Sequence, residues 1–127
     1  MSIRNYFSIP LYICVYTDKI TIRALDGSDR FLEGEPVTPF TTQRLLIGNF
    51  TSAEKTLSEG VDGLRGGGVV KKSFRAVIHP VDMSEDGLCE VEERVLRELV
   101  CSAGAHHHVI HTGSILSPNE ALDLLDS

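Results

Sequence analysis

The sequence predicts a single α/β domain built on a mixed β-sheet, and three observations favour that class. The first third of the chain contains three short strand-like segments separated by tight turns. Two later apolar runs of strand length each follow a stretch with helical periodicity. The 127 residues are 42% hydrophobic and 24% charged, which suits one folded domain over residues 1–127. Strands joined by helices pair in parallel and hairpin strands pair antiparallel, so the sheet should be mixed.

The N-terminal third predicts an antiparallel meander. Leu11–Tyr16 is an almost continuous apolar run, which is typical of a strand buried on both faces. Lys19–Leu25 alternates between apolar and polar residues, so it should be a half-buried strand that pairs with the first. Thr17 and Asp18 should form the tight turn between them. An Asp-Gly turn signal follows, and Asp29–Glu33 should be the third strand.

The next segment predicts a loop and a helix. Gly34–Thr42 contains two prolines, as loops often do. Thr51 and Glu54 have the spacing of a capping box, in which each side chain bonds a backbone amide of the other residue. A helix should therefore begin at Thr51. Gly60 and Gly63 should weaken the end of that helix because glycine has a low helix propensity.

The C-terminal half predicts two strands and two helices. Phe74–His79 should be a buried strand. The helix that follows carries an inward-facing apolar stripe of Leu88, Val91, Val95, Leu96, Leu99, Val100 and Ala103. Gly104 should follow its C-terminal end, and His107–His111 should be the last strand. Ser117 and Glu120 form a second capping box, which should begin a short final helix.

Charge, hydropathy and cysteine content exclude several classes of protein. Twelve Lys and Arg residues against eighteen Asp and Glu residues give a net charge of −6, which is unfavourable for binding a phosphate backbone, so no nucleic-acid partner is expected. No apolar segment approaches the ~20 residues of a membrane-spanning helix. Three cysteines without a Cys-x-x-Cys motif indicate free thiols in a reducing compartment, so a cytoplasmic location is expected.

The element order strand-strand-strand-helix-strand-helix-strand-helix is that of the ribonuclease-H-like fold, which actin and its relatives share. Local motifs add a resemblance to one such family. Glu90–Glu98 and Ser102–Ala105 resemble the helix and following turn of the MreB family, the bacterial actin homologues that determine rod shape. Glu35-Pro36 and Ile47–Glu54 are similar to motifs that precede that family's first helix here. The resemblance covers most of this chain but only the first subdomain of the family.

The same comparison implies that the ATPase machinery is lost. The family's first phosphate motif, Asp-x-Gly-Thr, corresponds to Cys14–Thr17, of which only Thr17 is kept. Tyr16 stands where glycine would let the backbone approach a phosphate, and the cysteine is no ligand for a hard cation such as Mg²⁺. Asn49 replaces an acidic residue, and no acid stands near His111–Gly113, where the resemblance would place the catalytic carboxylate. We therefore expect no ATPase activity and no cofactor.

These observations favour a non-catalytic, MreB-like module that binds a protein partner or another copy of itself, with a link to cell shape or the cytoskeleton. The alternative is a split actin-like ATPase half-domain that a partner chain completes. Thr17 and Asp18 would then contact the phosphates of the nucleotide.

A second alternative is metal handling by clustered histidines, His106, His107, His108 and His111, with help from Cys101 or His79. On a strand, however, His107 and His111 share one face and His106 and His108 the other, so all four could not converge on one ion. The cysteines also allow a Cys–His nucleophilic pair. Against that pair, Cys14 lies in a buried strand and Cys101 flanks an apolar stripe, where thiols are commonly unreactive.

Overall fold

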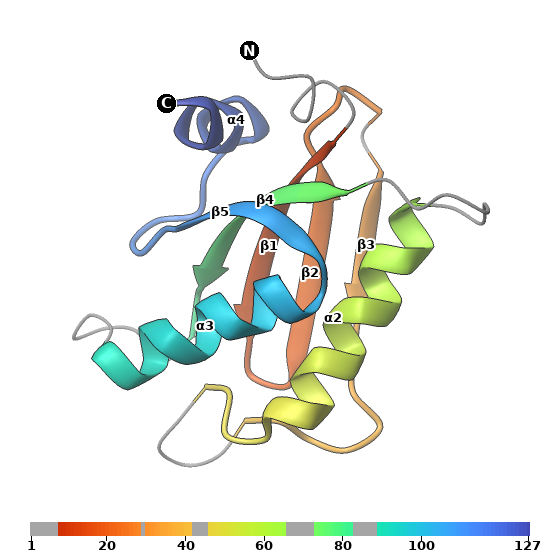
Figure 1. The fold of residues 1–127 in the computed structure, drawn as a ribbon, viewed down its shortest axis with the longest axis vertical. Helices are drawn as coiled ribbons and strands as arrows, with labels where there is room; N and C mark the ends of the chain where they lie inside the picture. The colour runs from red at the N-terminus through yellow and green to blue at the C-terminus, as the bar shows by residue number, and fades with distance from the viewer. Residues whose placement is uncertain (1–7, 29, 42–45, 66–72, 83–88) are drawn as a thin grey trace.

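The computed structural model describes residues 8–28, 30–41, 46–65, 73–82 and 89–127 (Figure 1). Its elements are β1 (Ile9–Tyr16), β2 (Lys19–Ala24), β3 (Phe31–Gly34), α2 (Phe50–Arg65), β4 (Phe74–Pro80), α3 (Glu90–Ser102), β5 (Ala105–Ile110) and α4 (Pro118–Asp126). Strands and helices alternate in the predicted order. The expected mixed α/β class is therefore confirmed.

The five strands form one sheet in the spatial order β3-β2-β1-β4-β5. β1 pairs antiparallel with β2, and β2 pairs antiparallel with β3. β1 pairs in parallel with β4, and β4 pairs in parallel with β5. The crossover helices α2 and α3 lie side by side on one face of the sheet, and α4 packs on the other face against β4, β1 and β5 (Figure 1). The sheet is therefore the middle layer of three.

The two faces of β1 supply two separate cores. The larger core, between the sheet and helices α2 and α3, takes alternate residues of this strand, Leu11, Ile13 and Val15. The smaller core, under α4, contains Tyr12, Cys14, Leu25, Val77, Ala121 and Leu125. Each large aliphatic side chain that is buried in this way contributes about 1.5–3 kcal/mol to folding. The smaller core differs from the larger one because it includes polar side chains of β1.

Helix α2 begins at Phe50, so the prediction that Thr51 caps it is wrong. The cap is Asn49, whose Oδ1 accepts a hydrogen bond from the backbone N–H of Ser52 (3.2 Å). Asn49 is held in place because its own N–H donates to the carbonyl of Phe40 (2.8 Å). Thr51 lies one position too far along the chain and is an exposed residue of the first turn.

The ends of α3 and α4 match the sequence pattern except at one residue. The predicted capping box of α4 is present, with Glu120 N–H donating to Ser117 Oγ (3.2 Å) and Ser117 N–H donating to Glu120 Oε1 (3.0 Å). Gly104 follows α3 with a φ of 109°, as expected for a glycine after a helix.

The apolar stripe predicted for α3 is wrong at one residue. Val91 is 62% exposed, so its predicted inward position is wrong. The first turn of α3 extends beyond the sheet (Figure 1). Leu88, placed on the same stripe, lies outside the described residues.

All five strands differ from their predicted bounds. β1 begins at Ile9 instead of Leu11, β2 ends at Ala24 instead of Leu25, and β4 ends at Pro80 instead of His79. The differences are larger for β3 and β5. β3 covers Phe31–Gly34 instead of Asp29–Glu33, because the preceding turn is longer than two residues: Ala24 N–H donates to the carbonyl of Arg30 (2.9 Å). β5 covers Ala105–Ile110 instead of His107–His111, because pairing with β4 begins directly after the glycine turn.

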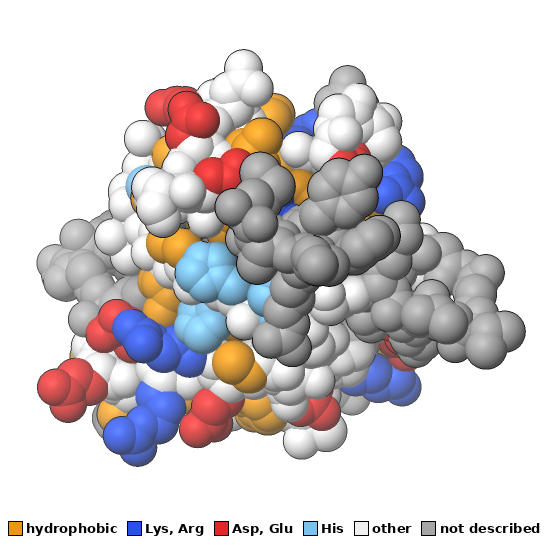
Figure 2. Space-filling view, turned by 45° about the horizontal axis from the view of Figure 1, so that its top comes forward, with side chains coloured by type: hydrophobic (Ala, Val, Ile, Leu, Met, Phe, Trp, Pro, Cys, Tyr) orange, Lys and Arg blue, Asp and Glu red, His pale blue; other side chains and the backbone are white. Residues whose placement is uncertain are grey.

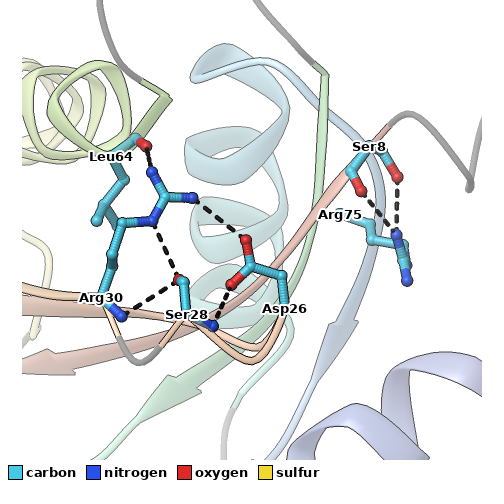
Figure 3. A network of polar contacts seen from close by, with 6 residues as sticks. All are labelled: Ser8, Asp26, Ser28, Arg30, Leu64 and Arg75. Carbon is cyan, nitrogen blue, oxygen red and sulfur yellow. Dashed lines mark hydrogen bonds and ion pairs between the residues drawn. The ribbon is translucent and has the colours of Figure 1, made fainter.

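A polar network fastens the β2–β3 turn to the end of α2 (Figure 3). Arg30 donates hydrogen bonds to Ser28 Oγ (3.1 Å) and to the carbonyl of Leu64, and it forms an ion pair with Asp26 (3.2 Å). Hydrogen bonds from Ser28, followed by those from Arg30, lower the pKa of Asp26, so this carboxylate is charged at neutral pH. Because the last carbonyls of a helix lack partners within the helix, Arg30 stabilises the end of α2.

No helix in the described ranges is both long enough and apolar enough to cross a membrane.

Gly60 and Gly63 lie within α2 and test how closely that helix approaches the sheet. A Cβ at Gly60 would lie 2.7 Å from Ile22 Cδ1, whereas a Cβ at Gly63 would meet only Leu32, at 3.3 Å. We expect Gly60→Ala to destabilise the protein by about 1–3 kcal/mol, because a fully buried isoleucine must move. Gly63→Ala should stabilise it by up to about 1 kcal/mol through helix propensity. Urea unfolding followed by circular dichroism measures both. Equal stabilisation by the two alanines would contradict the close approach.

Candidate functional site

The turn between β1 and β2 holds Thr17 and Asp18, the residues predicted to contact phosphate if a nucleotide bound. Thr17 N–H donates to Asp82 Oδ2 (2.8 Å), and Asp18 N–H donates to Thr41 Oγ1 (3.0 Å). The Asp18 carboxylate accepts hydrogen bonds from the backbone amides of Phe40 (2.9 Å) and Thr41 (2.7 Å). The turn amides are thus already bonded to side chains of the protein, and two carboxylates bring negative charge to the place a phosphate would occupy.

Under α4, a buried chain of hydrogen bonds joins β1, β4 and the segment before α4. Tyr12 Oη lies 2.8 Å from His79 Nδ1, and His79 Nε2 lies 3.0 Å from the carbonyl oxygen of Gly113. Because a carbonyl only accepts, Nε2 carries the proton and Nδ1 accepts the hydrogen bond from the Tyr12 hydroxyl. Tyr12 Oη also accepts from Leu116 N–H (3.0 Å). Both side chains are therefore satisfied although His79 is 0% and Tyr12 is 5% exposed.

Burial sets the protonation states of this network. Burial lowers the pKa of His79 below its ordinary value, and the charge of the nearby His111 lowers it further, so the ring is neutral at pH 7. Burial raises the pKa of Tyr12, which therefore keeps its proton. Burial also raises the pKa of Cys14 in the same core, so its thiol is not the nucleophilic thiolate. The arrangement holds neutral groups together and offers no activated nucleophile.

His111 closes the network at the surface. Its ring meets the ring of His79 edge to face, with 4.8 Å between the centroids. Its Nε2–H donates to the carbonyl of Ser114 (3.0 Å). Gly113, between these residues, has a φ of 114°, a conformation that lets the chain turn its carbonyl back toward His79. The two rings together fix the path of the chain from β5 to α4.

Beside this network, a pocket of about 380 Å³ opens between β1, β2, β3, the segment before α4 and the first residue of that helix. Its lining consists of Tyr12, Cys14, Tyr16, Thr21, Arg23, Phe31, Ile115, Leu116 and Pro118. Phe31 and Ile115 are 52% and 57% exposed, and they are two of the four large apolar side chains exposed in the described ranges. The Arg23 guanidinium lies over the Phe31 ring at 4.9 Å, and Lys19 Nζ lies over the Tyr16 ring at 4.6 Å. The pocket therefore combines aromatic and cationic groups.

The four clustered histidines do not form one site. The strand register places His107 on the α4 side of the sheet and His108 on the α3 side. His111 lies on the same side as His107, as predicted, and His106 occupies a register irregularity at the start of β5. Histidine side chains nevertheless gather on one surface, next to Lys and Arg side chains (Figure 2). Across residues 8–28, 30–41, 46–65, 73–82 and 89–127, no three His, Cys, Asp or Glu side chains are grouped to hold a metal ion.

One cysteine–histidine pair is present. Cys101 Sγ lies 4.0 Å from His108 Nδ1, and Cys101, in the last turn of α3, is exposed. Cys101 flanks the apolar stripe of α3, next to the fully buried Val100, but its own side chain is exposed. Burial, followed by the charge of Arg97, lowers the pKa of His108. Cys89 is also exposed, and its thiol contacts Glu92 Oε1 (3.1 Å) instead of a histidine.

Sequence reasoning missed the network and most of the pocket. A signal for the network existed, because Tyr12, Cys14 and Tyr16 alternate with aliphatic residues within one apolar run, and His79 interrupts another. The pocket had no local signal, since its residues come from three strands, the segment before α4 and the start of that helix.

The comparisons with known proteins give one relative and no family description. No protein-family model matches this sequence. The chain is 34% identical over 124 residues to the uncharacterized protein YjaA of Escherichia coli strain K12. That match covers 91% of this chain and 95% of the relative.

The Asp18 carboxylate can be tested as a structural anchor. Asp18 has a left-handed backbone (φ 50°), which Asp and Asn tolerate better than most residues. We expect Asp18→Ala to lower the free energy of unfolding by about 1.5–3 kcal/mol, since two backbone amides lose a charged acceptor. Asp18→Asn keeps one acceptor oxygen and should lose clearly less. Urea titration provides the measurement, and an unchanged midpoint for Asp18→Ala would disprove the anchoring role.

The buried neutral state of His79 predicts a pH dependence of stability. Its pKa is lower in the folded protein than in the unfolded chain, so the unfolded chain binds more protons as the pH falls through about 6.5. Stability should be complete above that value and decrease as the pH falls toward the folded-state pKa. Unfolding free energies measured from about pH 7.5 to about pH 5.5 should show this decrease.

Two variants isolate the contribution of His79. His79→Gln, which cannot titrate at this position, should be less stable at neutral pH and should show a smaller decrease between about pH 6.5 and 5.5, because His108, whose pKa is also lowered by burial, still contributes. His107→Gln, an exposed control on β5, should keep the full decrease. A decrease that persists in full in His79→Gln would assign the effect to other groups.

Proposed function

This chain belongs to the same family as the uncharacterized protein YjaA of Escherichia coli strain K12. Since the name of that relative states no function, we propose one from the geometry of this chain. In this proposal the chain is a non-catalytic module that binds an extended segment of a partner protein, and it is located in the cytoplasm. The observation that carries it is the aromatic and cationic pocket beside β3, the outermost strand at that end of the sheet.

The surface around the pocket has the composition of a binding site. We call it the open face; it consists of Tyr16, Lys19, Thr21, Arg23, Phe31 and Glu33, which the register places on the α4 side of β1, β2 and β3. Its two cations and one anion give a charge of 2 − 1 = +1, on a chain whose net charge is −6. Exposed aromatic rings and arginine are enriched where proteins bind one another. These features favour a partner segment that is apolar and acidic.

The outer edge of β3 gives the partner segment a second means of binding, in addition to the pocket. In the described part of the chain, no strand pairs with the outer edge of β3. An extended segment could therefore add to the sheet through backbone hydrogen bonds, as in other complexes that form by strand addition. Alternate side chains of that segment would face the same side as Phe31 and Glu33. An apolar side chain would fill the pocket, and an acidic one would meet Arg23, because Lys19 forms an ion pair with Glu33 (3.3 Å).

The polar groups near the pocket support binding instead of catalysis. His79 and Tyr12 are neutral and bonded to each other, and Cys14 keeps its proton. The amides of Thr17 and Asp18 are bonded to side chains of the protein. These contacts give no support to the alternative of a split ATPase.

The finer part of the proposal is a ribonuclease-H-like, MreB-like domain with a role in cell shape. The order of strands and helices supports it, and so do the sequence motifs, which fall at the start of α2 and along α3. Cosedimentation with purified MreB filaments tests it. Failure to cosediment would remove this finer part and leave the binding module.

Selection from a random peptide library displayed on phage tests the open face without knowledge of the partner. We expect the selected peptides to combine apolar and acidic residues. Phe31→Ser and Arg23→Ala should each weaken their binding about tenfold, which is about 1.4 kcal/mol. Val91→Ser is the matched control, because Val91 is comparably exposed (62%) but lies on α3. It should leave the affinity unchanged.

Two results would overturn the proposal. One is that no peptide is selected, or that the selected peptides bind the open-face variants as tightly as the parent protein. The other is a rise of several degrees in the melting temperature with millimolar Mg-ATP, which would show nucleotide binding to the folded state.

A further inference from the structure

Cys101 and His108 form a pair of metal-ligand atoms on the side of the sheet opposite the open face. The thiol comes from the last turn of α3 and the imidazole from β5, and Sγ and Nδ1 are 4.0 Å apart. Cys101 is exposed and His108 is half-buried. Sulfur and imidazole nitrogen are the donors that Zn²⁺ prefers in proteins.

The distance between the two atoms is close to that required to share one ion. With Zn–S near 2.3 Å and Zn–N near 2.0 Å, tetrahedral coordination places the two donors about 3.5 Å apart. The pair therefore needs to close by roughly 0.5 Å, which a rotation of the exposed Cys101 side chain can supply. The rings of His79 and His111 are also in contact with each other, but they cannot rotate without losing hydrogen bonds, because their Nε2–H groups donate to backbone carbonyls.

One chain supplies two of the four ligands of a structural zinc site. No third His, Cys, Asp or Glu joins this pair in the part of the chain that the structure describes. The pair lies along β5, the last strand of the sheet, whose outer edge pairs with no described strand. We propose that two copies of this chain bind one Zn²⁺ between them, each through Cys101 and His108. The result is a Cys₂His₂ site on a twofold axis.

Charge is compatible with this arrangement. Each thiol releases its proton to solvent when it binds the metal, so two thiolates neutralise the two positive charges of the ion. The nearest cation on α3, Arg97, forms an ion pair with Glu93 (3.3 Å). Two copies that each carry −6 repel one another, and the neutral site adds no further charge to the dimer.

Sedimentation velocity of the metal-free full chain, with and without Zn²⁺ in a non-thiol reductant, tests the proposal. The reductant excludes a disulfide between the exposed cysteines. We expect the mass to double at one half-equivalent of Zn²⁺, with one metal retained per two chains after dialysis. Co²⁺ in place of Zn²⁺ should give a thiolate charge-transfer band.

Four variants locate the ligands. Cys101→Ser and His108→Gln should abolish the dimer and the retained metal. Cys89→Ser, the other exposed thiol, and His107→Gln, the neighbour on the opposite face of β5, should leave both unchanged. Three results would overturn the proposal. The chain could stay monomeric with Zn²⁺, it could bind one Zn²⁺ per monomer, or the His108→Gln variant could still dimerise with Zn²⁺.

Discussion

The parallel pairing of β1 with β4 is the interaction on which the rest of the structure depends. β1 lies between β2 and β4, and its side chains enter the cores on both faces of the sheet. Helices α2, α3 and α4 each pack on one of those two faces. Without the pairing, the N-terminal hairpin would have no helical layer, and β4, β5 and their helices would have no central strand. The register also brings His79 next to Cys14, which two residue pairs of the β1–β2 ladder separate from the turn that Asp18 fastens.

The two faces of β1 are used differently because their side chains differ in polarity. Aliphatic residues meet α2 and α3 and make an apolar core that is closed to water. Tyr12, Cys14 and Tyr16 meet a layer that has one helix, α4, and polar atoms on that side need partners. On the β4 side of β1, His79 and the segment before α4 supply those partners. On the β2 and β3 side the same face reaches solvent, and aromatic rings are paired with cations there. A partner can be accommodated on this side.

Much of the fold could be predicted from local patterns, whereas features that depend on contacts between segments could not. The strands, the helix along α3 and the Ser117 capping box follow from apolar spacing and local hydrogen-bonding residues. Asn49 and Thr51 are both suitable helix caps, and the contact of Asn49 with Phe40, across the preceding loop, decides between them. Val91 fits the helical stripe, but its exposure depends on where the sheet ends. The candidate site required the structure for the same reason, since its residues come from separate strands.

The long separation between β1 and its partners has a consequence during protein synthesis. Tyr12 bonds to His79, 67 residues later, and to Leu116, 104 residues later. At about 5–20 residues per second, these partners leave the ribosome roughly 3–13 s and 5–20 s after β1. During that interval the hairpin of β1 and β2 can form, but the edge of β1 that pairs with β4 and the face that α4 covers are exposed. The nascent chain therefore passes through a period in which it is a substrate for chaperones and open to strand pairing with other chains.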